Sequence, residues 1–300
     1  MRGKVPTGGA SSAIDSRKVA DMGKVCVVTG GCGGMGFASA MELGRDYALV
    51  ITGRNPEKLE SKVAQLRDMG FEAHGCACNV GVREDVAKLA KTASELGEVM
   101  AVVHTAGVSP ALCAAEGIMA TNAVGTVNIV EEFFDVMGEG GVLINFASMA
   151  AFAMEPTAEW LEAYDLWREP EFQDKMLALC GEAIDDPDFA FMRNGTAYSI
   201  SKRFVVEFSR RNSARFAAKG CRILSVSPGC YYTDMHKALI ERQADTAEAQ
   251  LDLIPVGRWG HPYEIGGLVK FLCSSDAAYI TGTDILADGG STANMSVAQV

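Results

Sequence analysis

Tyr198 and Lys202 lie four residues apart in Tyr-Ser-Ile-Ser-Lys, at the start of a segment with helical spacing. Side chains at i and i+4 share one face of a helix, so the phenol and the ammonium can face one site. A free tyrosine has a pKa of about 10, and a neighbouring cation favours the phenolate and lowers that pKa. The pair therefore predicts a proton donor and acceptor for an alcohol or a ketone. The alternative is an ordinary ion–phenol pair on a helix surface.

A glycine-rich loop follows the first apolar run of the chain. Val25–Thr29 leads directly into Gly30-Gly-Cys-Gly-Gly34-Met35-Gly36, after which the spacing becomes helical. Glycines at a strand-to-helix turn let the backbone approach a pyrophosphate, and the helix N-terminus favours its negative charge. This position indicates a dinucleotide site, and the alternative is a tight turn that holds no ligand.

The second apolar run ends in Thr52-Gly53-Arg54-Asn55. A carboxylate here would bind the 2′-hydroxyl of NAD and repel a 2′-phosphate, but none is present. The planar guanidinium of Arg54 suits a phosphate. The sequence therefore favours NADP as cofactor, with NAD as the alternative if Arg54 is only a solvated surface charge.

Elements that could position these residues alternate regularly along the chain. Short apolar runs alternate with segments of helical spacing, which is typical of a parallel sheet covered by helices on both faces. The runs are Val25–Thr29, Ala48–Thr52, Ala73–Cys78, Met100–His104, Val142–Phe146, Arg222–Ser227 and Asp284–Ala287. We expect one α/β domain over residues 23–300, a Rossmann-like, doubly wound parallel sheet of seven strands. Residues 1–22, rich in Gly, Ser and charge, are predicted to be a disordered leader.

Composition excludes several classes of protein. The chain is 48% hydrophobic and 22% charged, and it has no apolar run of the roughly 18 residues that a membrane span needs. A formal net charge of −11 disfavours nucleic acid and anionic membranes as partners. Nine scattered cysteines without a CxxC pair, and four histidines that do not cluster with them, favour a reducing, cytoplasmic location with no disulfides and no metal site.

Residues 152–194 interrupt the alternation of strands and helices. Pro156 and Pro170 lie where two short helices are expected to start. Their apolar stripes are Trp160, Tyr164 and Trp167 in the first helix, and Phe172, Met176, Leu179 and Ala183 in the second. The segment carries 11 acidic and 3 basic residues, so most of the net charge of the chain belongs to it.

The ordered set of motifs resembles the short-chain dehydrogenase/reductase family over roughly residues 24–292, apart from the insertion. The matching positions are Thr29-Gly-x-x-x-Gly34-x-Gly36, Ala106-Gly107, Asn122, Ser148, Tyr198-x-x-x-Lys202, Pro228-Gly229 and Thr233. Further matches are Pro255-Val-Gly-Arg-Trp-Gly260, Tyr279-Ile-Thr-Gly282 and Asp288-Gly-Gly290. The resemblance implies an oxidoreductase that interconverts a secondary alcohol and a ketone with a nicotinamide cofactor.

The resemblance also implies a role for each matched residue. Tyr198 would be the general acid and base, and Lys202 would lower its pKa and bind the nicotinamide ribose. Ser148 would hydrogen-bond the substrate oxygen, Asn122 would hold a water in the proton path, and Thr233 would bind the carboxamide. From residue chemistry alone, Ser148 is equally a turn cap and Asn122 a satisfied polar residue inside a helix. Residues expected at the cofactor are Gly30, Gly34, Met35, Gly36, Arg54, Asn79, Val80, Ala106, Gly107, Tyr198, Lys202 and Thr233.

Three positions depart from the family pattern. Asn79-Val80 stands where the family often has Asp-Val, so the hydrogen-bonding group that meets adenine is kept but its charge is lost. His104-Thr105 replaces Asn-Asn before Ala106-Gly107, which bears on the hydrogen bonds of the fourth strand more than on the chemistry. Gly33 occupies a loop position that is often basic in NADP-using members, which counts against NADP.

The insertion suggests a substrate class. Family members usually have about a dozen residues between the serine and the tyrosine, whereas Ser148 and Tyr198 are 50 apart. Since the insertion is attached beside the catalytic groups, its aromatic stripes could roof a bulky alicyclic substrate such as a hydroxysteroid or bile acid. The alternative is that the stripes bury the helices against the scaffold or form a subunit interface.

Other functions of the same fold remain open alternatives. One is a 3-oxoacyl thioester reductase, which the acidic insertion disfavours because such enzymes present a basic surface to an acidic carrier protein. An enoyl reductase usually spaces its Tyr and Lys more widely. A non-catalytic NADP sensor need not retain Ser148, Asn122, Tyr198 and Lys202 together. The family commonly forms homodimers or homotetramers through helices near Asn122 and Tyr198, a contact that the insertion would block or replace.

Overall fold

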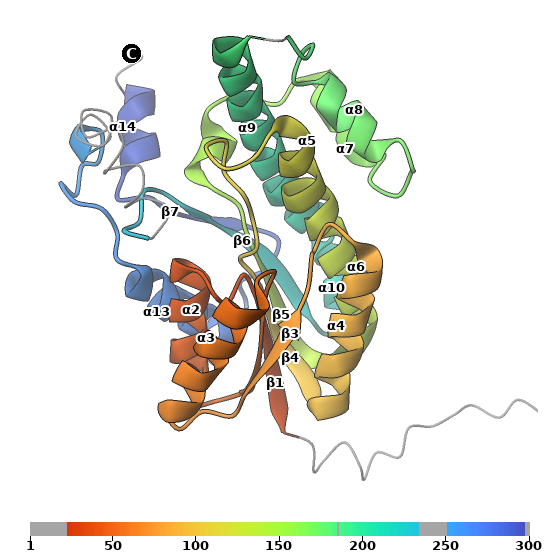
Figure 1. Cartoon of the computed structure of the whole chain (residues 1–300), viewed down its shortest axis with the longest axis vertical. Coiled ribbons are helices and arrows are strands. Elements are labelled where there is room, and N and C mark those ends of the chain that lie inside the picture. The colour runs from red at the N-terminus through yellow and green to blue at the C-terminus, as the bar shows by residue number, and fades with distance from the viewer. Residues whose placement is uncertain (1–22, 185, 234–250, 298–300) are drawn as a thin grey trace, which may run out of the picture.

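Seven parallel strands form one sheet, in the order β3-β2-β1-β4-β5-β6-β7 (Figure 1). The computed structural model describes residues 23–184, 186–233 and 251–297, and the predicted disordered leader, residues 1–22, lies outside the described residues. The strands are β1 (Lys24–Thr29), β2 (Ala48–Gly53), β3 (Ala73–Ala77), β4 (Glu98–His104), β5 (Met137–Phe146), β6 (Arg222–Pro228) and β7 (Asp284–Ala287). Every predicted strand is therefore confirmed. The order reverses between β1 and β4, and the carboxyl ends of strands at such a switch point form the usual ligand crevice of α/β sheets.

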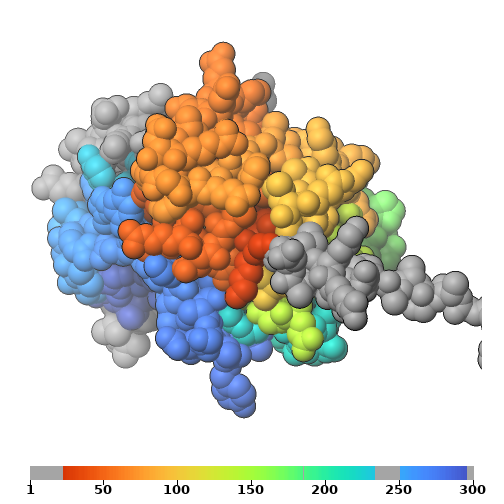
Figure 2. Space-filling model, turned by 90° about the horizontal axis from the view of Figure 1, so that it is seen from below, coloured from red at the N-terminus to blue at the C-terminus, as the bar shows by residue number. Residues whose placement is uncertain are grey.

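Helices cover both faces of the sheet because buried parallel strands are apolar on both sides. In β1, Cys26 and Val28 face one core, while Val25 and Val27 face the other. The first core is covered by α2 (Gly34–Leu43), α3 (Pro56–Asp68) and α13 (Pro262–Cys273), and the second by α4 (Arg83–Leu96), α6 (Gly125–Val136) and α9 (Pro187–Arg211). Seen from the end where the chain enters β1, the red and orange N-terminal segments lie against blue C-terminal ones (Figure 2). The single α/β domain with a doubly wound sheet is as predicted.

Short elements complete the described chain. A π-helical turn, η1, joins α5 to α6 and is wider than an α-helix, a feature that is frequent at functional sites. The short elements are α5 (Ala115–Ile118), η1 (Met119–Val124), η2 (Met149–Phe152), α10 (Ser213–Ala218), η3 (Ser275–Ala277) and α14 (Ser291–Val297).

Helix α9 begins earlier than the sequence analysis predicts. Asp186 accepts hydrogen bonds from the backbone N–H groups of Asp188 and Phe189, and Pro187 is the first helical residue. This N-cap and N1 pair starts the helix eleven residues before Tyr198. The prediction that Tyr198 opens the helix is therefore wrong: the last part of the insertion adds three turns to the N-terminus of α9.

The rest of the insertion folds into α7 (Ala158–Asp165) and α8 (Phe172–Ala178), close to the two predicted starts. Trp160 and Tyr164 of α7 and Phe172 and Met176 of α8 are buried, but the predicted second stripe is cut short, because α8 ends at Ala178 and Ala183 is exposed. Tyr164 and Phe172 contact the ring of Phe204 with centroids 5.3 and 5.0 Å apart, and Trp167 contacts Phe208 at 5.0 Å. The stripes thus bury the two helices against α9, which is the scaffold alternative of the sequence analysis rather than a roof over a substrate.

Candidate active site

Tyr198 and Ser148 come together where α9 passes the carboxyl end of β5. Ser148 is the N-cap of η2, and its hydroxyl oxygen accepts a hydrogen bond from the Ala150 N–H at 3.2 Å. A hydrogen bond joins the Ser148 and Tyr198 side chains. Ser148 is therefore both a turn cap and a neighbour of the phenol, so the two readings of this residue are compatible. The two hydroxyl groups therefore lie side by side at the carboxyl end of β5.

Lys202 is buried close to Tyr198 but is bonded elsewhere. Its ammonium lies 5.8 Å from the centre of the Tyr198 ring and donates a hydrogen bond to the Phe146 carbonyl at 2.9 Å. Burial lowers the pKa of Lys202 to about 8. Burial also raises the pKa of Tyr198; its hydrogen bond with Ser148 opposes this, and the nearby Cys230 thiol adds to it. Burial is the largest influence on the Tyr198 pKa and Lys202 is not among the groups that shift it, so the predicted effect of the ammonium on the phenol stays a prediction.

Asn122 lies in the π-helical turn with a side chain already held by protein. Its Oδ1 accepts from the Val108 N–H at 2.9 Å, and its Nδ2 donates to the Val108 carbonyl at 3.1 Å and to Ser201 Oγ at 3.3 Å. The amide nitrogen of the side chain therefore has no proton left for a water. A water in the proton path must use the Asn122 backbone carbonyl or the second lone pair of Oδ1.

The glycine-rich loop and the neighbouring strand ends form a cleft of about 440 Å³. All ten residues predicted at the cofactor besides Tyr198 and Lys202 line it: Gly30, Gly34, Met35, Gly36, Arg54, Asn79, Val80, Ala106, Gly107 and Thr233. Thr233 lies against Gly34, whose added Cβ would be 2.8 Å from the Thr233 methyl. Helix α2 and the strand ends thus converge on one elongated site.

The cleft fits a dinucleotide. Gly30 has φ +67°, a conformation that favours glycine, and a Cβ on Gly36 would lie 2.5 Å from the Gly30 carbonyl oxygen. Helix α2 begins beside them with no side-chain cap and no acidic residue in its first turn. Its N-terminal N–H groups are therefore suited to a pyrophosphate.

The far end of the cleft is basic. Arg54 and Lys58 line it, and no Asp or Glu is among the described residues that do so. Asn55 caps α3 by accepting the Lys58 N–H at 2.9 Å, which places the Lys58 backbone one helical turn from the strand end. Lys58 also lowers the pKa of the Cys32 thiol, against the larger effect of burial, which raises it.

Several lining residues were missed by the sequence analysis. They are Cys32, Gly33, Thr52, Gly53, Lys58, Cys78, Thr105, Val108, Leu112, Cys113 and Thr121. The capping signal Asn55-Pro56 was available for Lys58, since a residue in the first turn of a helix after β2 stays near the strand end. Leu112 and Cys113 lie in a loop without a motif, so only the folded chain identifies them.

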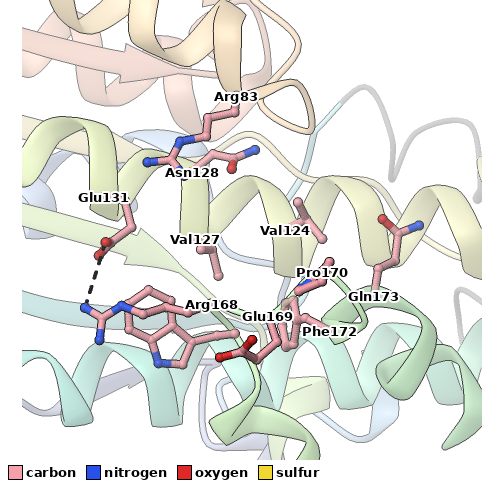
Figure 3. Close-up of a pocket in the computed structure, with 11 residues that line it drawn as sticks. Arg83, Val124, Val127, Asn128, Glu131, Arg168, Glu169, Pro170, Phe172 and Gln173 are labelled. Atoms are coloured by element: carbon pink, nitrogen blue, oxygen red, sulfur yellow. Dashed lines mark ion pairs between the residues drawn. The ribbon is translucent and has the colours of Figure 1, made fainter.

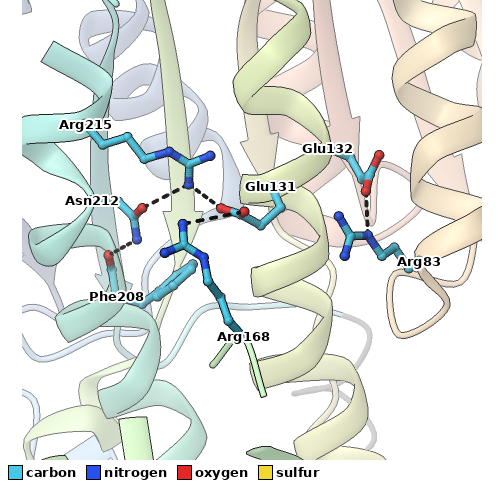
Figure 4. A network of polar contacts seen from close by, with 7 residues as sticks. All are labelled: Arg83, Glu131, Glu132, Arg168, Phe208, Asn212 and Arg215. Carbon is cyan, nitrogen blue, oxygen red and sulfur yellow. Dashed lines mark hydrogen bonds and ion pairs between the residues drawn. The ribbon is translucent and has the colours of Figure 1, made fainter. Parts of the chain in front are cut away.

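A second cleft, also of about 440 Å³, separates the insertion from α6 (Figure 3). Val124 at the end of η1 and Val127 of α6 face Pro170 and Phe172 across it. A polar network borders this cleft (Figure 4): Glu131 of α6 pairs with Arg215 of α10 and, at 4.0 Å, with Arg168 of the insertion. The insertion is thus anchored to α6 by charge as well as to α9 by packing.

Some expected features concern the whole described chain. No helix in residues 23–184, 186–233 and 251–297 is long and apolar enough to cross a membrane. Over the same residues, no group of three or more His, Cys, Asp or Glu side chains is arranged to hold a metal ion. All nine cysteines lie in the described residues, and none of them forms a disulfide bond there.

A dinucleotide-type crevice in a doubly wound sheet, with a Tyr–Ser–Lys group beside it, defines a nucleotide-dependent α/β oxidoreductase. The family model described as short chain dehydrogenase matches residues 24–161, and the one described as enoyl-(acyl carrier protein) reductase matches residues 189–292. Short-chain dehydrogenase/reductase bsc3 of Alternaria brassicicola is 31% identical over 278 residues, covering 92% of this chain and 98% of the relative. Dehydrogenase/reductase SDR family member 4 of Oryctolagus cuniculus is 30% identical over 288 residues, covering 95% and 100%. The chain belongs to the short-chain dehydrogenase/reductase family and is an NAD(P)-dependent enzyme.

Solved structures share the fold. A short-chain dehydrogenase from Burkholderia cenocepacia in complex with NADP has a TM-score of 0.71 at 21% identity, covering 90% of this chain and 98% of that one. The F189W actinorhodin polyketide ketoreductase with NADPH has a TM-score of 0.70 at 22% identity, covering 90% and 97%. At these identities the likeness concerns the architecture alone.

Proposed function

We propose that this chain reduces a bulky apolar ketone, or oxidises the matching secondary alcohol, with NADP(H). The observation that carries the proposal is the Tyr198–Ser148 hydrogen bond beside Lys202, whose ammonium lies against Gly107 in the lining of a cleft suited to a dinucleotide. If Ser148 were only a turn cap, and Tyr198 and Lys202 only a pair on a helix surface, nothing would require the three groups to meet beside this cleft. Sensors need no proton donor there, so the arrangement favours an enzyme over a binding protein.

The proposed chemistry divides between two hydroxyls and an ammonium. When bound, NADPH supplies hydride to the carbonyl carbon. Burial keeps the Tyr198 phenol protonated at neutral pH, so it donates its proton to the substrate oxygen during reduction and recovers it during oxidation. The Ser148 hydroxyl donates to the same oxygen and stabilises its developing negative charge. Lys202 supplies a fixed positive charge beside the phenol and hydrogen-bonds the ribose.

Two cations support NADP as the preferred cofactor. Arg54 and Lys58 can pair with a 2′-phosphate from either side of the strand end, and no carboxylate of the described cleft lining opposes it. Gly33 counted against NADP, and we propose that Lys58, which lines the same cleft, takes the part of the basic loop residue that is missing there. Solved neighbours are described as bound to NADP or NADPH.

An uncovered apolar rim supports a bulky substrate. Phe191 is 65% exposed and lies seven residues before Tyr198, on nearly the same face of α9. Asn194, between them, accepts the Ala115 N–H at 2.9 Å, so this face of α9 points towards the loop that holds Leu112. Leu112 is also 65% exposed and lines the cleft. We propose the rings of a hydroxysteroid or a bile acid as the occupant of this rim, because they offer an extended apolar surface to such exposed side chains.

Assembly through the family contact near Asn122 and Tyr198 conflicts with the insertion. Helices α7 and α8 lie on α9, and α8 also contacts η1, so the outer face of these elements is occupied within the chain. We therefore propose that any homodimer or homotetramer uses another face. We also propose a reducing, cytoplasmic location, which nine cysteines without a disulfide bond support.

The proposed activity is tested by following NADPH consumption with a panel of bile acid and steroid ketones, small ketones and a 3-oxoacyl thioester. Tyr198→Phe should lower kcat by at least about 100-fold, because it removes the proton donor and keeps the ring. Ser148→Ala should lower kcat by a similar factor. Equal rates for wild type and Tyr198→Phe would contradict the proposed chemistry, and a preference for the thioester would favour the alternative substrate class.

A further inference from the structure

A buried histidine bridges three elements of the site. His104, at the end of β4, is 2% exposed. Its Nδ1 is 2.7 Å from the Thr29 hydroxyl at the end of β1, and its Nε2 is 3.2 Å from the Thr126 hydroxyl in α6. The histidine therefore replaces the usual asparagine with a longer, two-ended connection, which the proposed function leaves unexplained.

The direction of each hydrogen bond along this bridge follows from its two ends. At one end the Thr126 hydroxyl donates its only proton to the Asn122 carbonyl at 2.7 Å, so it must accept from His104 Nε2–H. At the other end the Ala106 N–H donates to Thr29 Oγ1 at 3.2 Å. A neutral imidazole protonated on Nε2 has a lone pair on Nδ1, which accepts the Thr29 proton. Every proton then points from the Ala106 amide towards the Asn122 carbonyl.

An imidazolium does not fit this arrangement. It would put a second proton on Nδ1, where the Thr29 hydroxyl already donates. Burial, with a smaller contribution from the Lys202 ammonium, lowers the pKa of His104 to about 3. His104 is thus a neutral bridge that can stand beside a buried cation without repelling it.

The bridge closes a ring around one strip of the cleft. Asn122 holds both backbone groups of Val108 through its side chain, while Thr29 holds the Ala106 N–H. Hydrogen bonds thus hold both ends of the backbone segment Ala106–Val108, which we call the clamped strip. Between them lies Gly107, where an added Cβ would be 3.2 Å from both Asn122 Oδ1 and Lys202 Nζ. The Lys202 ammonium thus rests against the clamped strip.

We propose that His104, as the neutral Nε2-protonated tautomer, is a positioning residue that holds the Ala106–Val108 strip and the Asn122 carbonyl in place for Lys202 and the nicotinamide half of the cofactor. The expected effect on kcat rests on the proposed function, whereas the tautomer and charge of the His104 imidazole do not. Two measurements keep these parts separate.

The first measurement is ¹⁵N NMR of the histidine rings in the intact protein, with His104→Asn used to assign the signal. The expected spectrum has a pyrrole-like Nε2 and a pyridine-like Nδ1 for His104, unchanged across the neutral range. The opposite tautomer, or an imidazolium at neutral pH, would overturn the proposal even if the enzyme proves active on ketones. This readout needs no substrate and stands if the proposed activity fails.

The second measurement compares Thr126→Val with Thr126→Ser. The valine variant removes the hydroxyl that links His104 to Asn122, and kcat should fall about tenfold, which corresponds to roughly 1.4 kcal/mol. The serine variant keeps the hydroxyl and should stay within about twofold of wild type, as its bond to Asn122 is retained. Thr92→Val is the matched control. It removes the same kind of hydrogen bond, from a threonine hydroxyl to an i−4 carbonyl, at an exposed position of α4.

A lower Tm for Thr126→Val with an unchanged kcat would show a merely structural role and overturn the positioning claim. Equal loss of kcat in the serine and valine variants would do the same, since the hydroxyl would not be the cause. Absence of ketone reduction by the wild type would instead refute the proposed function.

Discussion

The apolar rim makes a sharp prediction for Phe191→Ala. A phenylalanine presents roughly 200 Å² of surface, and Phe191 is 65% exposed, so about 130 Å² are free to contact a substrate. If a ring system covers half of that area, the contact is worth about 1.6 kcal/mol at ~25 cal/mol per Å². The truncation should therefore lower kcat/KM for a steroid-sized ketone a little more than tenfold. A small ketone that reaches only Tyr198 should lose less than about twofold.

Phe189→Ala is the matched control for this experiment. Phe189 is 51% exposed on the same helix end, but it precedes Tyr198 by nine residues and so lies on the opposite side of α9. Kinetics with both ketones, and Tm for each variant, separate substrate contact from helix stability. Equal losses in the two variants, or equal losses for large and small ketones in Phe191→Ala, would refute the argument that the rim selects bulky substrates.

Three further predictions follow from the site. Replacing Arg54 and Lys58 together by Ala should raise KM for NADPH at least about tenfold and leave KM for NADH nearly unchanged, because only a 2′-phosphate needs the cations. A Lys91→Ala control on α4 should change neither KM value. A parallel rise in both KM values of the double variant would contradict the NADP preference. Burial raises the pKa of Tyr198 and lowers the pKa of Lys202 to about 8. The kcat/KM for ketone reduction should therefore be constant on the acid side and fall as pH rises through about 8, whereas kcat/KM for alcohol oxidation should rise with pH. A loss of ketone reduction on the acid side of neutrality would contradict the assignment of Tyr198 as proton donor. Hydrogen exchange of α7 and α8 should not depend on protein concentration, because their apolar faces are already buried within the chain; concentration-dependent protection there would place a subunit contact on the insertion.

Packing decided what the insertion does. Periodicity predicted two helices with aromatic stripes, but a stripe at helical spacing is equally consistent with facing a substrate and with facing α9. Only the contacts of Tyr164, Trp167 and Phe172 with Phe204 and Phe208 resolve this, because they involve residues more than thirty positions apart in sequence. The early start of α9, by contrast, has a local signal in Asp186-Pro187, an N-cap residue followed by proline at the first helical position.

The sequence by itself determined the sheet, the glycine-rich loop, and the residues Tyr198, Ser148 and Arg54, because strand periodicity and strand-to-helix turns are local properties of a chain. Tertiary structure alone decided the electrostatics and the links between elements. Whether a cation or burial controls the Tyr198 pKa depends on how much water the fold removes from around the phenol. In this chain burial has the largest effect, and it raises that pKa. The bridge from Thr29 through His104 to Asn122 joins three separate elements. No local pattern encodes it, because hydrogen bonds between distant segments exist only once the chain has folded.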